Sequence, residues 1–336
     1  MQTTKKKKRP TIRDVAALAG VSVATVSRYL NGKTNKMTNA TAAKIKEAIA
    51  KLQYIPNPAA REMSHNKSMI VVIVVANVAD YFSTEIFKGA SRKLEAAGYV
   101  PVLLDSGADQ SHEKRILNSV NIHGFDGLLF QPLTSDTALI QSELTRHFPV
   151  VILDRELKRS PWPQVVTDNY QAARNATRHF IKEGFQHVVV LSSTIKQAST
   201  RQERYQGIAD SADDVSVIEI DENHFDRDQV YQQLASLLDQ QQKTMLFSLK
   251  ERWLLEFLPR LMQDGLISQS NTRVTGFADT SLIKSICPYA QVISQNPAYM
   301  GERAAAVLLK MLKGDSQEID DIVIKARFAG DESAEN

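Results

Sequence analysis

The sequence predicts a small all-α head followed by a larger α/β region that contains two doubly wound parallel sheets. Residues 11–52 carry apolar residues at helical spacing in three short segments, with turn and capping residues between them. From residue 68 onward, short continuous apolar runs alternate with amphipathic stretches of about ten to sixteen residues. Such alternation is typical of parallel sheets covered by helices. Roughly ten apolar runs over about 260 residues favour two sheets rather than one.

Length and composition limit the class of protein. The 336 residues are enough for two or three domains, and 43% of them are apolar, so large cores can form. Cys287 is the single cysteine and excludes a disulfide framework, which fits a reducing cytoplasm. No stretch approaches about twenty consecutive apolar residues, and the lysine-rich start is not followed by the apolar core of a signal peptide. We therefore expect a cytoplasmic protein without a membrane partner.

The first two predicted helices form a helix-turn-helix. Thr11 and Asp14 have the spacing of a capping-box variant, and Gly20 supplies the flexible backbone of the turn. Ser22 is a good N-cap for the second helix. The apolar positions are Ile12, Val15, Ala16, Leu18 and Ala19 in the first helix and Val23, Val26 and Leu30 in the second.

The second helix of such a motif enters the major groove of DNA with its first residues at the base edges. Its polar positions here are Thr25, Ser27, Arg28 and Asn31. Short helical corners also occur in many proteins that do not bind DNA, so this pattern alone leaves both interpretations open.

Positive charge is concentrated in the head. Residues 1–65 contain 13 lysine and arginine residues and three acidic residues, a net charge of +10, whereas the whole chain carries +3 and the remainder therefore −7. Attraction to phosphates requires an electrostatic footprint of this kind. Residues 5–9 could be only a solvated tail, but we expect a mobile arm that also adds sequence-independent attraction to DNA.

A third helix and a short segment after it complete the head. Thr38 can cap this helix, whose apolar side closes a three-helix core. Asn57 and Pro58 mark a further helix start. Residues 59–63 allow only one or two turns, which are too short to be stable alone in water. We expect this segment to order only against a partner.

The run DVAALAGVSVATVSRYLNG, the segment LQYIPNPAARE and the α/β region together resemble the lac repressor/galactose repressor family of bacterial transcription regulators. The resemblance covers residues 9–330 and is most specific in the head. It implies a two-lobed, periplasmic-binding-protein-like sensor whose lobes are joined by three crossovers, placed here near Pro163, Ser294 and Asp321. The domains expected are a helix-turn-helix domain (1–56), a hinge helix and linker (57–67), an N-terminal lobe (68–163 and 294–320), a C-terminal lobe (164–293 and 321–330) and a disordered tail (331–336).

The resemblance implies a homodimeric regulator, with a repressor as the expected form, that binds pseudo-palindromic double-stranded operator DNA and kinks a central CG step. Arg28 can bond guanine through two donors, and Val23 and Ala24 can contact thymine methyl groups. Phosphate contacts are expected from Thr11, Ser22, Thr25, Ser27 and Asn31. The hinge positions expected on DNA are Asn57, Ala60 and Met63. Met63 stands where leucine is usual and would wedge into the minor groove, unless it is a linker residue without a role.

Polar and aromatic residues that follow predicted strands are candidates for an effector cleft. These candidates are Phe82, Ser83, Arg155, Asp168, Asn169, Thr200, Arg204, Lys250 and Asp279. Arg204 lies in TRQERYQGI, which is similar to the family's ligand-binding arginine motif. A guanidinium can hold a carboxylate, a phosphate or a hydroxyl pair through two parallel donors. The alternative is that Arg204 is an exposed helix arginine.

Two departures from sugar-binding relatives bear on the effector. Lys250 and Glu251 stand where those relatives place Asn-Asp, and Ala278 stands where they place aspartate, with Asp279 one residue later. Both changes should make the cleft more cationic and favour anionic ligands. SRYLNGKTNKMT, TDN followed by Tyr170, and TRQER also look like the branch of the family that controls use of sugar acids such as 2-keto-3-deoxygluconate. We therefore hypothesise an allosteric sugar-acid or phosphosugar effector.

Catalysis and cofactor binding are not expected. The chain lacks a dinucleotide fingerprint after its first strand and a G-x-S-x-G elbow, and its seven histidines have no metal-ligand spacing. Residues that converge only in space could still form an active site. The alternatives are therefore a solute-binding protein of transport, against which the basic head and missing export signal argue, and a sugar-modifying enzyme with a basic appendage.

Overall fold

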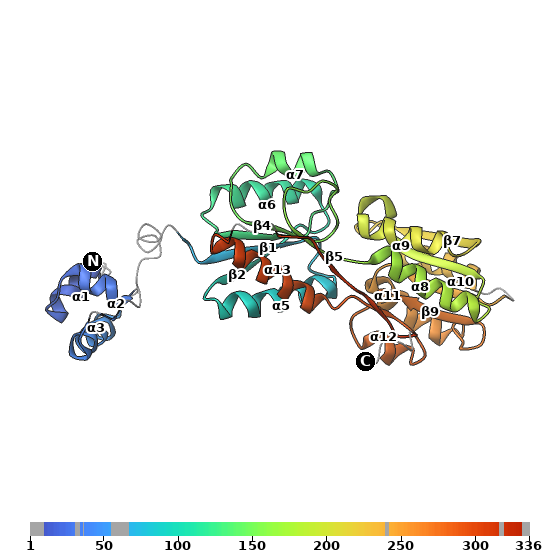
Figure 1. Cartoon of the computed structure of the whole chain (residues 1–336). Coiled ribbons are helices and arrows are strands. Elements are labelled where there is room, and N and C mark those ends of the chain that lie inside the picture. The colour runs from blue at the N-terminus through green and yellow to red at the C-terminus, as the bar shows by residue number, and fades with distance from the viewer. Residues whose placement is uncertain are drawn as a thin grey trace, which may run out of the picture. The chain divides into compact units, whose positions relative to one another are not determined.

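The computed structural model describes residues 10–30, 34–35, 37–54, 67–238, 242–315 and 319–330. The chain divides into two compact units, Met1–Ser68 and Met69–Asn336, which we call the head and the sensor (Figure 1). Within the described ranges, no helix has the length and apolar character needed to span a membrane.

The head is a three-helix unit made of α1 (Ile12–Ala19), α2 (Val23–Leu30) and α3 (Asn39–Leu52). The predicted capping box between Thr11 and Asp14 is confirmed, and Gly20 ends α1 with a left-handed φ of 66°. Thr38 caps α3 by accepting a hydrogen bond from the Thr41 amide at 3.2 Å. Fully buried apolar side chains from all three helices, Val15, Val26 and Ile45, form the centre of the small core.

Two apolar positions of the head differ from the prediction. Leu18 is 46% exposed and Val23 is 41% exposed, so neither belongs to the core. Val15, Ala16 and Ala19 already define the buried side of α1, and Leu18 lies on the neighbouring side of the helix. Val23 lies in the first turn of α2, where only Val26 is buried.

The first lobe of the sensor is a six-stranded parallel sheet with the order β11-β5-β4-β3-β1-β2. Helices cover both faces, with α5 and α13 on one side and α6 and α7 on the other (Figure 1). The strands are β1 (Ile70–Val75), β2 (Val100–Asp105), β3 (Gly127–Phe130), β4 (Val150–Asp154), β5 (Gln164–Thr167) and β11 (Ile322–Ile324). The helices are α5 (Tyr81–Ala96), α6 (Gln110–Ile122), α7 (Thr137–Glu143) and α13 (Pro297–Leu312).

The second lobe is a four-stranded parallel sheet with the order β7-β6-β8-β9. Its strands are β6 (His187–Ser193), β7 (Asp214–Ile220), β8 (Thr244–Ser248) and β9 (Thr272–Gly276). Helices α8 (Asn169–Lys182) and α9 (Ser199–Ala209) cover one face, and α10 (Arg227–Leu238) and α11 (Glu251–Gln263) cover the other. A short helical turn (Ile195–Gln197), α12 (Leu282–Ile286) and the antiparallel pair β10 (Ile293–Ser294) and β12 (Arg327–Phe328) complete this lobe.

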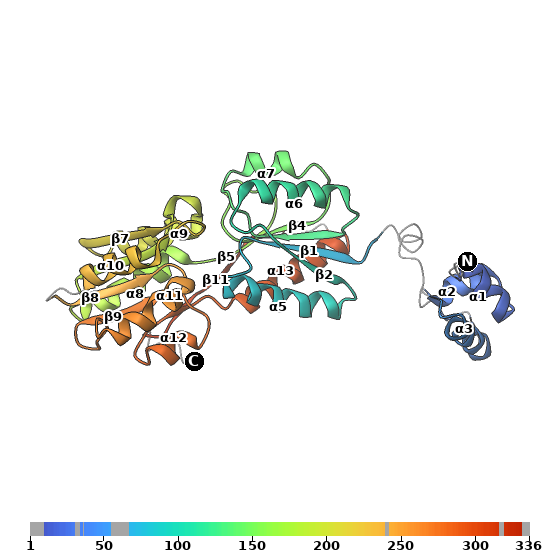
Figure 2. The same ribbon diagram turned by 180° about the vertical axis from the view of Figure 1, so that it is seen from behind.

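Two of the three crossovers lie a few residues beyond their predicted places. The prediction put them near Pro163 and Asp321, but β5 and β11 pair with each other and β5 also pairs with β4, so both strands belong to the first lobe (Figure 2). The chain therefore leaves this lobe at Asp168 and again at Lys325. Short apolar strands of the two lobes look alike in sequence, which is why the prediction assigned β5 and β11 to the second lobe. The remaining crossover follows β10, next to Ser294.

Helices α5 and α13 approach so closely that side chains are excluded at their contact. A Cβ added to Gly89 would lie 1.8 Å from the Ala298 carbonyl oxygen, and one added to Gly301 would lie 2.0 Å from that of Ile86. Both neighbours are backbone atoms, which cannot turn aside as a flexible side chain could. The two helices can therefore pack this way only with glycine at both positions.

The buried carboxyl group of Glu113 is another unusual feature of the first lobe. Glu113 is 5% exposed and accepts a hydrogen bond from the Leu133 amide at 2.8 Å. Burial raises its pKa to about 7, although the Leu133 hydrogen bond and the positive charge of Arg155 oppose the shift. Glu113 thus holds the loop after β3, whose Pro132 carbonyl accepts a hydrogen bond from Arg155.

We predict that Gly89→Ala lowers the free energy of unfolding of the sensor by about 1–3 kcal/mol, because α5 must move away from α13. Urea unfolding followed by tryptophan fluorescence measures this, since Trp162 and Trp253 both lie in the sensor. Glu95→Ala, at an exposed position of α5, is the control and should change the stability by less than about 0.5 kcal/mol. Equal stability of the two variants would contradict the packing argument.

We also predict that Glu113 makes the sensor less stable as the pH rises. Its pKa is higher in the folded protein than the ordinary 4.5, so its contribution is fully present below pH 4.5 and is lost as the pH passes through 7. Between these limits, the loss should be on the order of 3 kcal/mol. Glu113→Gln keeps an acceptor for Leu133 but cannot titrate, so its unfolding free energy should fall less over this range. Glu95→Gln is the control, and equal pH profiles for the two variants would refute the assignment.

Candidate functional site

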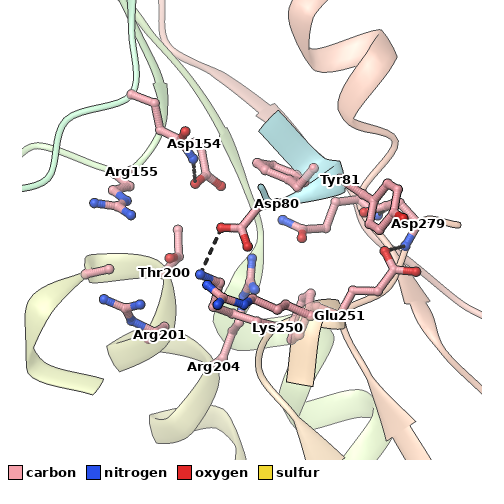
Figure 3. Close-up of a pocket in the computed structure, with 16 residues that line it drawn as sticks. Asp80, Tyr81, Asp154, Arg155, Thr200, Arg201, Arg204, Lys250, Glu251 and Asp279 are labelled. Atoms are coloured by element: carbon pink, nitrogen blue, oxygen red, sulfur yellow. Dashed lines mark hydrogen bonds and ion pairs between the residues drawn. The ribbon is translucent and has the colours of Figure 1, made fainter. Parts of the chain in front are cut away.

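A cavity lies between the two lobes of the sensor, at the carboxyl ends of their parallel strands (Figure 3). Its non-atom space is about 600 Å³ when open solvent is included. Folds of this kind bind ligands at this place. Charged residues from both lobes line it, among them Asp80 and Arg155 from the first and Arg201, Lys250 and Asp279 from the second.

The structure brings six of the nine predicted effector residues into this cavity. These six are Phe82, Arg155, Thr200, Arg204, Lys250 and Asp279. Ser83 does not line it, because the residue is buried in the first turn of α5, where its hydroxyl donates to Gln131 Oε1 at 3.4 Å. Asp168 lies at a crossover and accepts a hydrogen bond from the Ala326 amide at 2.7 Å. Ser83 therefore contacts the lining residue Gln131 without lining the cavity itself, and Asp168 is hydrogen-bonded to the last crossover.

Asn169 also lies outside the cavity lining, yet it positions Arg204, which is buried rather than exposed. Arg204 Nε donates to Asn169 Oδ1 at 2.8 Å, and Nη1 donates to the Leu249 carbonyl at 2.6 Å. The guanidinium lies over the Phe277 ring, 3.8 Å from its centroid. Burial lowers the pKa of Arg204 to about 10, so it remains charged at neutral pH. These contacts fix the guanidinium at the floor of the cavity.

Asp279 lines the cavity and also forms hydrogen bonds with the crossover that follows β10. Its Oδ1 accepts hydrogen bonds from the Ser294 hydroxyl at 2.8 Å and from the amides of Gln295 at 2.7 Å and Asn296 at 3.1 Å. Burial raises its pKa, while these hydrogen bonds oppose the shift. One oxygen of the carboxylate is therefore occupied by the chain itself.

Lys250 is paired within the protein, contrary to what the sequence argument assumed. Its Nζ lies 2.8 Å from Asp80 Oδ2 and 2.8 Å from Glu222 Oε1. Burial alone would raise the pKa of Glu222, but Lys250 and Arg201 lower it to about 2, so this group is ionised. The expected excess of positive charge at Lys250 is therefore wrong, because two carboxylates already face the ammonium group.

Two other guanidinium groups retain free donors. Arg155 Nη1 donates to the Pro132 carbonyl at 2.8 Å, and Arg201 Nη1 donates to Glu222 at 3.1 Å. The Nε atoms of both arginines are buried and have no hydrogen-bond partner among the described residues. Both arginines line the cavity, and burial lowers the pKa of Arg201 while the charge of Arg155 lowers it further. Buried donors without partners on two like-charged groups favour binding of an anion between them.

Acceptors without partners lie in the same cavity. Asp154 Oδ2 accepts from Gln131 Nε2 at 2.8 Å, whereas Asp154 Oδ1 has no partner among the described residues. The same is true of Asp80 Oδ1. Asp154 also has a left-handed φ of 64°, which is uncommon for a residue other than glycine and occurs often at functional sites. The cavity thus offers both anion donors and hydroxyl acceptors.

Sequence reasoning missed several residues of the cavity. Asp154 and Gln131 could have been found, because Asp154 ends β4 and Gln131 directly follows β3. Both therefore lie at the carboxyl end of a strand, which was the criterion for the chosen candidates. Asp80 lies five residues after β1, and no local signal distinguishes it from other loop aspartates. Further lining residues outside the candidate set are Tyr81, Ala198, Arg201, Arg252, Phe277 and Gln295, and Glu251 lines the cavity beside Lys250. Among the described residues, no group of three histidine, cysteine or acidic side chains is placed to hold a metal ion.

The second candidate site is the exposed side of α2 in the head. Val23, Ala24 and Arg28 are exposed on the helix, away from the buried Val26. Ser22 Oγ accepts a hydrogen bond from the Thr25 amide at 3.2 Å, as an N-cap does. Of the other predicted contacts, Thr11 is exposed and Ser27 is half-buried. The positions Asn31, Asn57, Ala60 and Met63 lie outside the described residues.

Comparison with known proteins assigns both units. Residues 11–57 match the family described as "Bacterial regulatory proteins, lacI family", and residues 67–242 match "Periplasmic binding proteins and sugar binding domain of LacI family". The HTH-type transcriptional regulator KdgR of Bacillus subtilis (strain 168) is 28% identical over 323 residues, which cover 94% of this chain and 95% of KdgR.

Two solved structures extend the comparison. A LacI transcriptional regulator from Lactobacillus brevis is 45% identical, has a TM-score of 0.74, and covers 77% of this chain and 99% of its own. The transcriptional regulator CelR in complex with cellobiose is 25% identical, has a TM-score of 0.65, and covers 95% of this chain and 98% of its own. The chain therefore belongs to the LacI family of bacterial regulatory proteins and is a DNA-binding transcription regulator, not an enzyme.

Proposed function

We propose that this protein is a homodimeric, cytoplasmic repressor of genes for sugar-acid use, associated with the bacterial nucleoid and controlled by a small sugar acid bound between its lobes. The observation that carries the ligand class is the pair Arg155 and Arg201. Each contributes a charged guanidinium from a different lobe, and each has a buried Nε without a partner among the described residues. A carboxylate in the cavity would accept hydrogen bonds from the two guanidinium groups and screen the repulsion between them.

The rest of the cavity is suited to the hydroxyl groups of such a ligand. The Asp154 carboxylate can accept a hydrogen bond from a ligand hydroxyl group, and Gln131 donates to its Oδ2 and holds it in place. Thr200 and Arg204 lie on the opposite, second-lobe side. The relative KdgR and the sugar-acid features of the sequence support the same class of effector. This arrangement favours a polyhydroxy acid over a neutral sugar, because a carboxylate forms stronger, charge-assisted hydrogen bonds with guanidinium groups than a hydroxyl group does.

The effector would act by binding one arrangement of the lobes more tightly than another. A ligand that contacts Arg155 and Arg201 together stabilises the arrangement in which the two residues face one cavity. In a dimer, a change of lobe arrangement would alter how the two hinge segments, with Asn57, Ala60 and Met63, meet the minor groove. Arg28, Val23 and Ala24 would contact base edges, and Thr11, Ser22, Thr25, Ser27 and Asn31 would contact phosphates.

Calorimetric titration of the full chain tests the effector class. We expect 2-keto-3-deoxygluconate or gluconate to bind and glucose, their neutral counterpart, to give no measurable heat. Arg155→Gln and Arg201→Gln should each weaken acid binding about 10- to 100-fold, because each removes a charged hydrogen bond. Arg92→Gln removes an exposed charge on α5 and is the control, with affinity unchanged. Tight binding of glucose without any response to acids would overturn the proposal.

Replacement of Arg28 tests the DNA contact. After the preferred duplex has been selected from random sequences, Arg28→Ala should cost about 1–3 kcal/mol on that duplex and relax specificity at one base pair of each half-site. Lys44→Ala removes one exposed charge from α3 and serves as the control, which should not change the preferred sequence. Fluorescence anisotropy with single-base variants of the duplex measures both effects. Full discrimination by Arg28→Ala would show that another residue recognises that base.

A further inference from the structure

We propose that Asp80 is a specificity residue that limits the cavity to acids with a single negative charge. This inference rests on the sugar-acid function proposed above and goes further, because it defines which acids the sensor accepts. The chain's own carboxylate occupies the position that a second anionic group of the ligand would take.

The position of Asp80 is the first argument. Asp80 precedes α5 in the first lobe, and its carboxylate reaches across the cavity to Lys250 of the second lobe (Figure 3). The oxygen–nitrogen distance is 2.8 Å, and each of the two side chains is only 16% exposed. Among the salt bridges of the described residues, this is the one that joins the two lobes across the cavity. The Asp80–Lys250 ion pair can form only when the two lobes are close to each other.

The charge balance of the second lobe is the second argument. Arg201, Lys250 and Arg252 all face Glu222, at 3.1 Å, 2.8 Å and 3.6 Å. This lobe alone therefore places three cations around one carboxylate, an excess of two positive charges among these four groups. Asp80 adds a second carboxylate from the first lobe, so that one positive charge remains for one ligand carboxylate. Burial lowers the pKa of Arg201, and the negative charges of Glu222 and Asp80 oppose this shift, so Asp80 acts on Arg201 as well as on Lys250.

Asp80 has no other structural task that would explain its position. It stands at the N-cap of α5, but its side chain accepts no capping hydrogen bond from that helix. Its Oδ1 is buried without a hydrogen-bond partner among the described residues. The Asp80 carboxylate therefore pairs with the positive charge of Lys250 in the cavity and does not cap α5.

The consequence concerns the far end of the ligand. One carboxylate can bind between the guanidinium groups of Arg155 and Arg201, which both line the cavity. A second carboxylate or a phosphate near Lys250 would meet the negative charge of Asp80, and in a partly buried cavity such like-charge contacts are costly. A hydroxyl group at the same place carries no charge and avoids this repulsion. Monoacids should therefore bind and the matching diacids should be rejected.

Two matched pairs of ligands test this with the full chain by calorimetry. Gluconate and glucarate differ only in a terminal alcohol or carboxylate, and 2-keto-3-deoxygluconate and 2-keto-3-deoxyglucarate differ in the same way. For the unchanged protein, the dissociation constant of the diacid should exceed that of the monoacid at least tenfold. In Asp80→Asn, this ratio should fall at least tenfold, because Lys250 loses one of its two carboxylate partners and can pair with the second carboxylate of the ligand.

Asp80→Ser is a second variant in case the amide of Asp80→Asn makes a new contact, and it should lower the ratio in the same direction. Glu85→Gln removes the same charge from α5 outside this cavity, where Glu85 pairs with Lys88, and should leave the ratio unchanged. An unchanged ratio in both Asp80 variants, with monoacid binding retained, would overturn the inference but not the proposed function. An equal loss of affinity for both acids would also overturn it and assign Asp80 to lobe closure alone. Absence of any acid binding by the unchanged protein would refute the proposed function itself.

Discussion

The three crossovers between the lobes are the constraint on which the sensor depends. Because the chain crosses after β5, after β10 and after β11, the carboxyl ends of both parallel sheets meet at one cavity. The loops there bring together charges that lie far apart in sequence. Asp80 meets Lys250, and Arg155 approaches Arg201, in each case across the two lobes. Neither lobe alone contains the complete arrangement.

Local signals in the sequence were sufficient for the secondary structure and for part of the site. Capping at Thr11 and Thr38 and the left-handed turn at Gly20 depend on neighbouring residues only, and all three were predicted. Arg204 was recognised from its motif, and Arg155 from its place at the end of a strand. These are properties that a short stretch of sequence determines.

The remaining features depend on contacts between distant residues. Lys250 was expected to add positive charge, but its pairing with Asp80 and Glu222 joins residues 170 and 28 positions away. Asn169 was expected to contact the effector, and instead it orients Arg204. Two crossovers were misplaced because strand pairing, not composition, decides to which sheet β5 and β11 belong. No pattern within a single segment contains this information.

The glycine contact between α5 and α13 has a mechanical consequence. With backbone against backbone at Gly89 and Gly301, the two helices are in close contact and we expect them to move together. Asp80 stands at the beginning of α5, and Asn296, which follows a crossover, caps α13. A displacement of that crossover is therefore transmitted through a stiff pair of helices to the carboxylate in the cavity, and a reporter dye on either helix would register the same movement.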